Sequence, residues 1–171
     1  MTDIISPPPL TDAESAALVE LMFFAYRDFV ADPDDILDGL GFGRAHHRVL
    51  HFVGRGPGMT VAQLLDLLRI TKQSLSRVLK DLLEKGYVLQ KEGNEDRRQR
   101  LLYLTPNGEA LWHKLIAPQK KRFRRAVSEM QSGDENAFNN MLLHLINPNN
   151  RDAARQWIAR ASAQQTQSEK R

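Results

Sequence analysis

The side chains best suited to chemistry lie on one short segment, TKQSLSRVLKDLLEKGYV, residues 71–88. With helical spacing its leucines and valine share one face, and the opposite face is basic and short-chained, with no acidic residue before Asp81. Lys, Arg, Gln and Ser are the types that contact base edges and phosphates. This face carries Lys72, Gln73, Ser74, Ser76, Arg77 and Lys80. The pattern favours a helix in the DNA major groove over a plain solvated face, which would intersperse acidic residues.

A second group of candidate DNA contacts follows about a dozen residues later. Residues 96–100, Asp-Arg-Arg-Gln-Arg, place three arginines at a predicted β-turn. Arginine is the residue that enters narrow minor grooves, and Asp96 could orient Arg98 through a carboxylate–guanidinium contact. Alone, this cluster could equally be an exposed charged turn. After a basic helix it favours a DNA-contacting hairpin with Asp96, Arg97 and Arg98 at its tip.

Short elements must position these side chains. Thr60 and Thr71 stand where N-caps of two short helices are expected, with a very short turn between the helices, which is the helix-turn-helix arrangement. Gly86 ends the second helix, and residues 87–91 and 100–104 predict a hairpin. Two helices followed by a hairpin that leans on them is the winged-helix order.

Longer helices flank this unit. Thr11 and Glu14 have capping-box spacing and start a helix that we expect to stop at Asp32-Pro33, with a turn or short helix over 34–40 and another helix over 44–53. Thr105-Pro106 opens a long helix that Pro118 is expected to kink or interrupt. Further helices are predicted from Ser132, with Glu135 in capping-box spacing, and over about 151–161, followed by a frayed tail.

Composition is that of an ordinary soluble protein: 171 residues, 42% hydrophobic, 26% charged, no cysteine and a net charge of +3. The charge is unevenly placed, because residues 1–43 hold nine acidic and one basic residue, whereas 44–100 hold twelve basic and six acidic. A basic middle segment suggests a polyanionic partner. The N-terminus lacks signal-peptide character, and no apolar run suggests a membrane span.

From about Met59 to Ala110 the sequence resembles the MarR family of bacterial transcription regulators. The resemblance rests on the segment at 71–88 and on EDRRQRLLYLTPNGEAL, which contains the family's signature: Asp96, Arg98, Leu104, Thr105 and Gly108. It implies a mainly α (α+β) fold, a winged helix-turn-helix with a helical dimerisation lobe. The expected organisation is an N-terminal arm and dimerisation helix at 1–42, the DNA-binding lobe at 43–105, C-terminal dimerisation helices at 106–163 and a flexible tail at 164–171.

The family further implies a homodimer on a near-palindromic double-stranded DNA operator, with the apolar stripes of residues 18–29 and 138–158 at the dimer interface. Many relatives bind small aromatic or anionic effectors between the two lobes. By analogy the effector candidates here are Tyr26, Arg27, His47, Arg48, His51 and Trp112. Without cysteine, the chain departs from the family's peroxide-sensing branch.

Other readings carry less weight. His47 and His51 have i, i+4 spacing that could hold a metal, but no carboxylate lies close by in sequence, so structural histidines are favoured and no metal or cofactor is expected. The basic run at residues 120–125 is more typical of the solvent-exposed face of a helix than of a DNA contact. GRGPG does not match the phosphate-loop spacing, and no hydrolase motif appears, so an enzyme is not expected.

The prediction is a cytoplasmic, nucleoid-associated regulator, most readily a repressor released by an effector, without a membrane partner. The alternatives are an activator, a DNA binder without an effector, and a protein-interaction module whose basic surface meets acidic protein.

Overall fold

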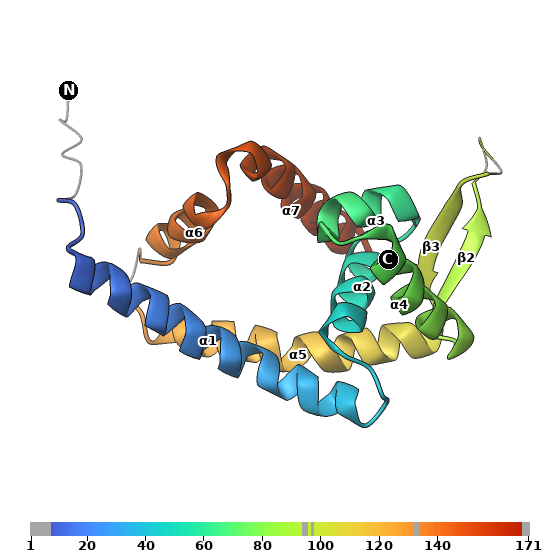
Figure 1. Ribbon diagram of the computed structural model, residues 1–171, viewed down its shortest axis with the longest axis horizontal. Helices are drawn as coiled ribbons and strands as arrows, with labels where there is room; N and C mark the ends of the chain where they lie inside the picture. Colours follow the sequence, from blue (N-terminus) through green and yellow to red (C-terminus); the bar gives the residue numbers. More distant parts are fainter. Residues whose placement is uncertain (1–7, 94–95, 97, 132–133, 169–171) are drawn as a thin grey trace.

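The computed structural model describes residues 8–93, 96, 98–131 and 134–168. The chain runs α1 (Asp12–Asp38), α2 (Arg44–Arg55), β1 (Met59–Thr60), α3 (Val61–Leu68), α4 (Lys72–Glu84), β2 (Val88–Glu92), β3 (Arg100–Leu104), α5 (Pro106–Ser128), α6 (Asp134–Leu145) and α7 (Pro148–Ser168). The long helices α1 and α5 lie side by side, and a small lobe of α2–α4 and the sheet sits at the Pro106 end of α5 (Figure 1). Helices α6 and α7 return the chain to this lobe.

The small lobe is a winged helix-turn-helix, as predicted. Its antiparallel sheet has the order β1-β3-β2, with Met59 opposite Leu102 and Val88 opposite Leu104. The two-residue strand β1 was not anticipated, because so short a segment has no periodicity to detect. A third strand gives the marginal hairpin an additional partner.

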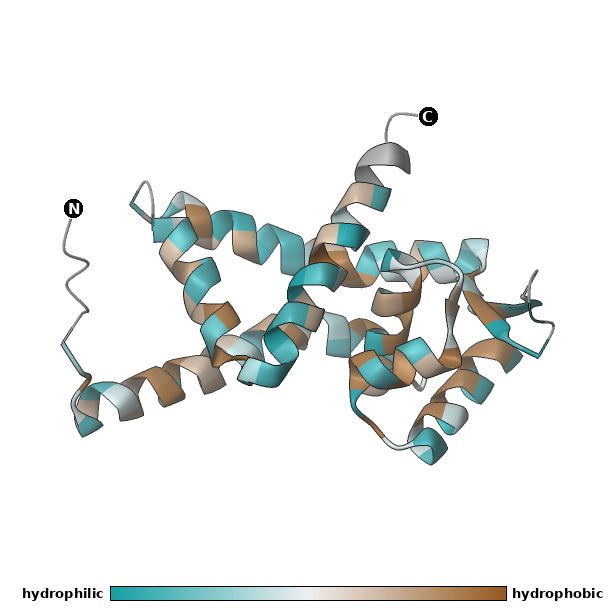
Figure 2. Cartoon of the chain, turned by 90° about the horizontal axis from the view of Figure 1, so that it is seen from above, coloured by the Kyte–Doolittle hydropathy of each residue, from teal (hydrophilic) through white to brown (hydrophobic). Residues whose placement is uncertain are grey.

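One continuous core holds the small lobe together and extends to α1 and α5. Its fully buried side chains include leucines of every helix from α1 to α5 and of β3: Leu37, Leu50, Leu64, Leu75, Leu82, Leu102 and Leu115. Figure 2 shows hydrophobic residues on the elements of this lobe and also along α1. Among the described residues, no helix is long and apolar enough to span a membrane.

The expected stop at Asp32-Pro33 is wrong, because α1 continues through Pro33 to Asp38. Proline lacks the N–H that would bond to the Phe29 carbonyl one turn earlier. Buried Gln119 of α5 instead donates from Nε2 to that carbonyl at 3.4 Å. Tertiary contact with α5 thus compensates for the hydrogen bond that Pro33 removes.

Three other boundaries differ from expectation. Helix α5 is not interrupted at Pro118, and the last helix begins at Pro148 and runs to Ser168, through most of the segment expected to fray. Pro148 occupies the first helical position, where a missing N–H costs nothing. Ser132, the expected cap of α6, lies outside the described residues.

Candidate nucleic-acid interface

Helix α4 presents the polar face that the sequence predicted. Thr71 caps the helix, accepting the Ser74 N–H at 3.1 Å and donating to Ser74 Oγ at 2.9 Å. Leu75, Val78 and Leu79 point into the core. All six candidate major-groove residues, Lys72, Gln73, Ser74, Ser76, Arg77 and Lys80, are exposed. The turn before Thr71 is tight because Arg69 adopts a left-handed conformation, φ 52°.

Charge on this face is largely uncompensated near the helix N-terminus. Lys80 reaches Glu84 at 3.8 Å, a weak exposed pair. In the described part of the chain, neither Lys72 nor Arg77 forms an ion pair with a carboxylate. Both cations, together with the positive end of the helix dipole, are therefore available to an anionic partner.

The other end of α4 is anchored to the start of α2. The N–H of Gly43 donates to His46 Nδ1 at 3.1 Å, which leaves the proton on Nε2, 3.2 Å from Asp81 Oδ2. Lys85 donates to the Leu40 carbonyl at 2.8 Å and lies 4.4 Å from the ring centroid of Phe42. Sequence reasoning missed the contacts of His46 with Asp81 and of Lys85 with Leu40, because their partners are 35 and 45 residues apart.

The hairpin is ordered by pairs other than the one expected. Asp96 Oδ1 accepts the backbone N–H of Arg98 at 2.9 Å, which is a turn-forming contact and not the anticipated contact with the guanidinium. Asp96 and Arg98 are exposed, and Glu92 pairs across the hairpin with Arg100 at 3.1 Å. Arg97, predicted for the wing, lies outside the described residues.

Thr105 and Gly108 join α5 to Gly86 and Tyr87, which follow the end of α4. Thr105 Oγ1 donates to the Gly86 carbonyl at 2.6 Å and accepts the Gly108 N–H at 3.1 Å, and the Thr105 N–H donates to the Tyr87 carbonyl at 3.1 Å. A Cβ on Gly108 would collide with that same Tyr87 carbonyl. The pair therefore holds the hairpin base, the end of α4 and the start of α5 together.

The effector candidates are spread over three helices. Tyr26 and Arg27 are exposed on α1; the Arg44 guanidinium lies 5.6 Å from the Tyr26 ring, and Arg27 pairs with Asp28 at 2.8 Å. Arg48 is exposed on α2. None of these three residues lines either of the two cavities described below.

The remaining candidates lie where α2 packs on α5. Burial lowers the pKa of His47, and burial followed by the charges of His47, Arg55 and Lys120 lowers the pKa of His51 to about 4. Gly54 brings α2 so close to Trp112 that a Cβ there would lie 2.6 Å from its ring. Trp112 Nε1 is buried and, among the described residues, has no hydrogen-bond partner. Nor do the described residues contain a cluster of three metal-ligating side chains.

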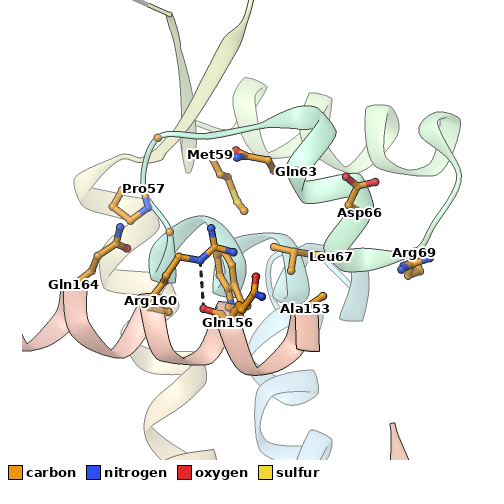
Figure 3. Close-up of a pocket in the computed structure, with 14 residues that line it drawn as sticks. Pro57, Met59, Gln63, Asp66, Leu67, Arg69, Ala153, Gln156, Arg160 and Gln164 are labelled. Atoms are coloured by element: carbon orange, nitrogen blue, oxygen red, sulfur yellow. Dashed lines mark hydrogen bonds between the residues drawn. The ribbon is translucent and has the colours of Figure 1, made fainter. Parts of the chain in front are cut away.

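A separate cavity of about 520 Å³ lies between α7 and the helix-turn-helix. Met59, Leu67 and Trp157 are among its apolar lining residues, and Arg160 and Gln164 of α7 face the turn at Pro57 (Figure 3). Within the wall, Arg160 Nε donates to the Gln156 carbonyl at 3.3 Å. This cavity contains none of the six predicted effector residues, so the sequence did not locate it.

Comparison with known proteins agrees with this geometry. A MarR family model matches residues 40–99. The HTH-type transcriptional regulator PetP of Rhodobacter capsulatus is 44% identical over 139 residues, covering 81% of this chain and 84% of that protein.

Solved structures show the same fold. Streptococcus pneumoniae FabT in complex with DNA has a TM-score of 0.68 and 19% identity, over 77% of this chain and 94% of that one. Staphylococcus aureus MarR in complex with salicylate and kanamycin has a TM-score of 0.64 and 19% identity, over 78% and 91%. The chain belongs to the MarR family and is a transcriptional regulator with a DNA-binding helix-turn-helix, not an enzyme.

Proposed function

We propose that the protein is a cytoplasmic homodimeric repressor that binds a near-palindromic operator and leaves it when a small effector binds. The observation that carries this proposal is the exposed face of α4, whose N-terminal cations Lys72 and Arg77 lack carboxylate partners in the described structure. A major-groove helix reads bases with side chains at its N-terminal end. Lys72, Gln73, Ser74, Ser76, Arg77 and Lys80 are proposed to do so, and Asp96, Arg97 and Arg98 to act at the minor groove.

Exposed apolar side chains support the homodimer. On α1, Leu21, Phe23 and Phe24 are 62%, 69% and 56% exposed, and Leu145 on α6 is 60% exposed. Large apolar side chains exposed in such number on one helix are typical of an interaction site. Two copies joined there by a two-fold axis would carry two recognition helices, and the DNA site would share that symmetry.

Two places in the structure are candidate binding sites for an effector. The first lies between α2 and α5, where the unpaired Nε1–H of Trp112 could donate to a carboxylate near the candidates His47 and His51. The exposed candidates Tyr26, Arg27 and Arg48 would have to move to contact the same ligand. The cavity beside Trp157 is the second, because its ligand would touch both α7 and α3. A screen of aromatic carboxylates by thermal shift, repeated on Trp112→Phe and on Arg160→Gln, identifies the site. If Trp112→Phe loses the thermal shift, the ligand binds between α2 and α5; if Arg160→Gln loses it, the ligand binds in the cavity beside Trp157.

The decisive experiment selects bound sequences from a random duplex library with the purified protein. Enrichment of an inverted repeat with half-sites about one DNA turn apart would support the dimeric operator reader. Affinity for that site should fall steeply with salt, by about 0.9 log units per phosphate contact per log unit of salt. The proposal would be refuted if the folded protein enriched no sequence and bound DNA weakly with an affinity that did not change with salt concentration. A promoter-reporter assay then separates repression from activation.

A further inference from the structure

Between α1 and α5 runs a groove of about 430 Å³ that the DNA-binding function does not use. It is lined by Asp32 and Ile36 of α1 and by Lys114, Pro118, Lys121, Arg122 and Arg125 of α5. These α5 residues recur at helical spacing, so one stripe of the helix faces the groove. Four of the seven lining residues are cationic and one is acidic.

The positive charge in the groove is only partly compensated. Arg122 reaches Asp32 at 3.4 Å through one terminal nitrogen. In the described structure Lys114, Lys121 and Arg125 form no ion pair with a carboxylate. Holding like charges along one groove is unfavourable without an anion between them.

One polar atom in the groove also lacks a partner. Arg122 Nε is buried, and among the described residues no acceptor bonds to it. A buried donor without an acceptor is unfavourable and calls for an explanation. An anion in the groove would supply the acceptor, since guanidinium groups bind phosphate and carboxylate oxygens through their N–H fork.

We propose that this groove binds a small, multiply charged organic anion through phosphate or carboxylate groups. Its volume exceeds the needs of a single inorganic ion and falls in the range of ligand pockets. Ile36 and Pro118 offer apolar contact beside the cations. A DNA backbone fits less well, because Arg122 Nε lies beneath the surface and because α4 and the hairpin are grouped at the Pro106 end of α5 (Figure 1).

The helix provides a matched control for a test. Lys120 and Arg124 belong to the same basic run and are exposed, yet they do not line the groove. The double variant Lys121→Gln, Arg125→Gln and the control Lys120→Gln, Arg124→Gln remove the same charge from the same helix. All four side chains are exposed, so both variants should fold; circular dichroism checks this.

Titration calorimetry of the full chain, without DNA and at low salt, uses inorganic pyrophosphate and citrate as probes. We expect the wild type to bind at least one of them; the preferred probe distinguishes a phosphate from a carboxylate ligand. The groove variant, and Arg122→Gln separately, should bind at least about ten-fold more weakly, whereas the control should change less than about two-fold. Equal loss in both double variants, or a wild type that binds neither probe, overturns the proposal. Weakened duplex binding with unchanged probe binding in the groove variant overturns it in favour of a DNA contact.

Discussion

The side chains of α4 divide between buried residues, which pack, and exposed residues, which we propose contact DNA. Leu75, Val78 and Leu79 are buried, whereas Arg77 between them is exposed and pairs with no carboxylate among the described residues. Truncating Arg77 therefore removes a side chain that stabilises nothing visible in the fold. Its loss should therefore weaken DNA binding and leave the free energy of unfolding unchanged.

Arg77→Ala should lose discrimination between operator and random DNA by about 1–3 kcal/mol, the value of a good bidentate base contact. Fluorescence anisotropy with both duplexes measures this. Lys91→Ala, an exposed cation of β2 whose ammonium lies over the Tyr103 ring, is the control and should leave the discrimination intact. If Arg77→Ala binds both duplexes with the affinities of the wild type, α4 is not the recognition helix.

His51 predicts pH-dependent stability. Its pKa is about 4 in the folded protein, because burial disfavours the charged form, and about 6.5 in an unfolded chain. As pH falls, the unfolded state takes up the proton first, so the stability present above about pH 6.5 is lost progressively down to about pH 4. Between pH 7 and pH 5 this loss should amount to about 2 kcal/mol.

Urea unfolding at the two pH values checks the prediction. His51→Gln should reduce the difference and leave the part due to His47, whose pKa burial also lowers. His144→Gln, which changes an exposed side chain on α6, should retain the full difference. An unchanged pH dependence in His51→Gln would mean that other groups cause it.

At the scale of elements, the junction of α4, the hairpin and α5 depends on a close backbone approach. Thr105 links to Gly86 and Gly108, and the carbonyl of Tyr87 occupies the space beside Gly108. The signature Leu-Thr-x-x-Gly thus has a structural reason: threonine caps α5, and glycine lets the first turn of α5 pass the backbone at Tyr87.

Gly108→Ala should destabilise the protein by more than about 2 kcal/mol, because the Cβ meets backbone that cannot move without displacing the strand or helix. Thermal and urea unfolding measure the change. Gly43→Ala is the control, since a Cβ there meets nothing within 4 Å and the φ of −132° suits any residue. Equal effects of both substitutions would contradict the role assigned to Gly108.

For the whole molecule, the exposed apolar residues of α1 and α6 predict self-association. Leu21→Glu with Phe24→Glu places two carboxylates one turn apart on the apolar part of α1. We expect this variant to be monomeric in sedimentation equilibrium and to bind a full operator no better than a half-site. Asp35→Lys, at an exposed position of the same helix, is the control and should remain dimeric. A dimeric double variant would place the interface elsewhere.

The sequence by itself determined the winged helix, because its signals are local. Thr71 and Thr105 cap the helices predicted for them, Gly86 has φ +72° at the end of α4, and the leucine spacing identified the buried and exposed faces of α4. Each of these depends on residues within a turn or two of one another. The major-groove candidates could therefore be chosen from spacing alone.

Only the tertiary structure decided what depends on distant residues. Pro33 stops a helix unless another group satisfies the Phe29 carbonyl, and that group, Gln119, is 90 residues away from Phe29. The anchors of α4 at His46 and Leu40, the cavity beside Trp157 and the groove at Arg122 likewise join helices far apart in the chain. Local propensity carries no information on which side chains meet across such separations; packing of α1 against α5 and of α7 against the small lobe decides it.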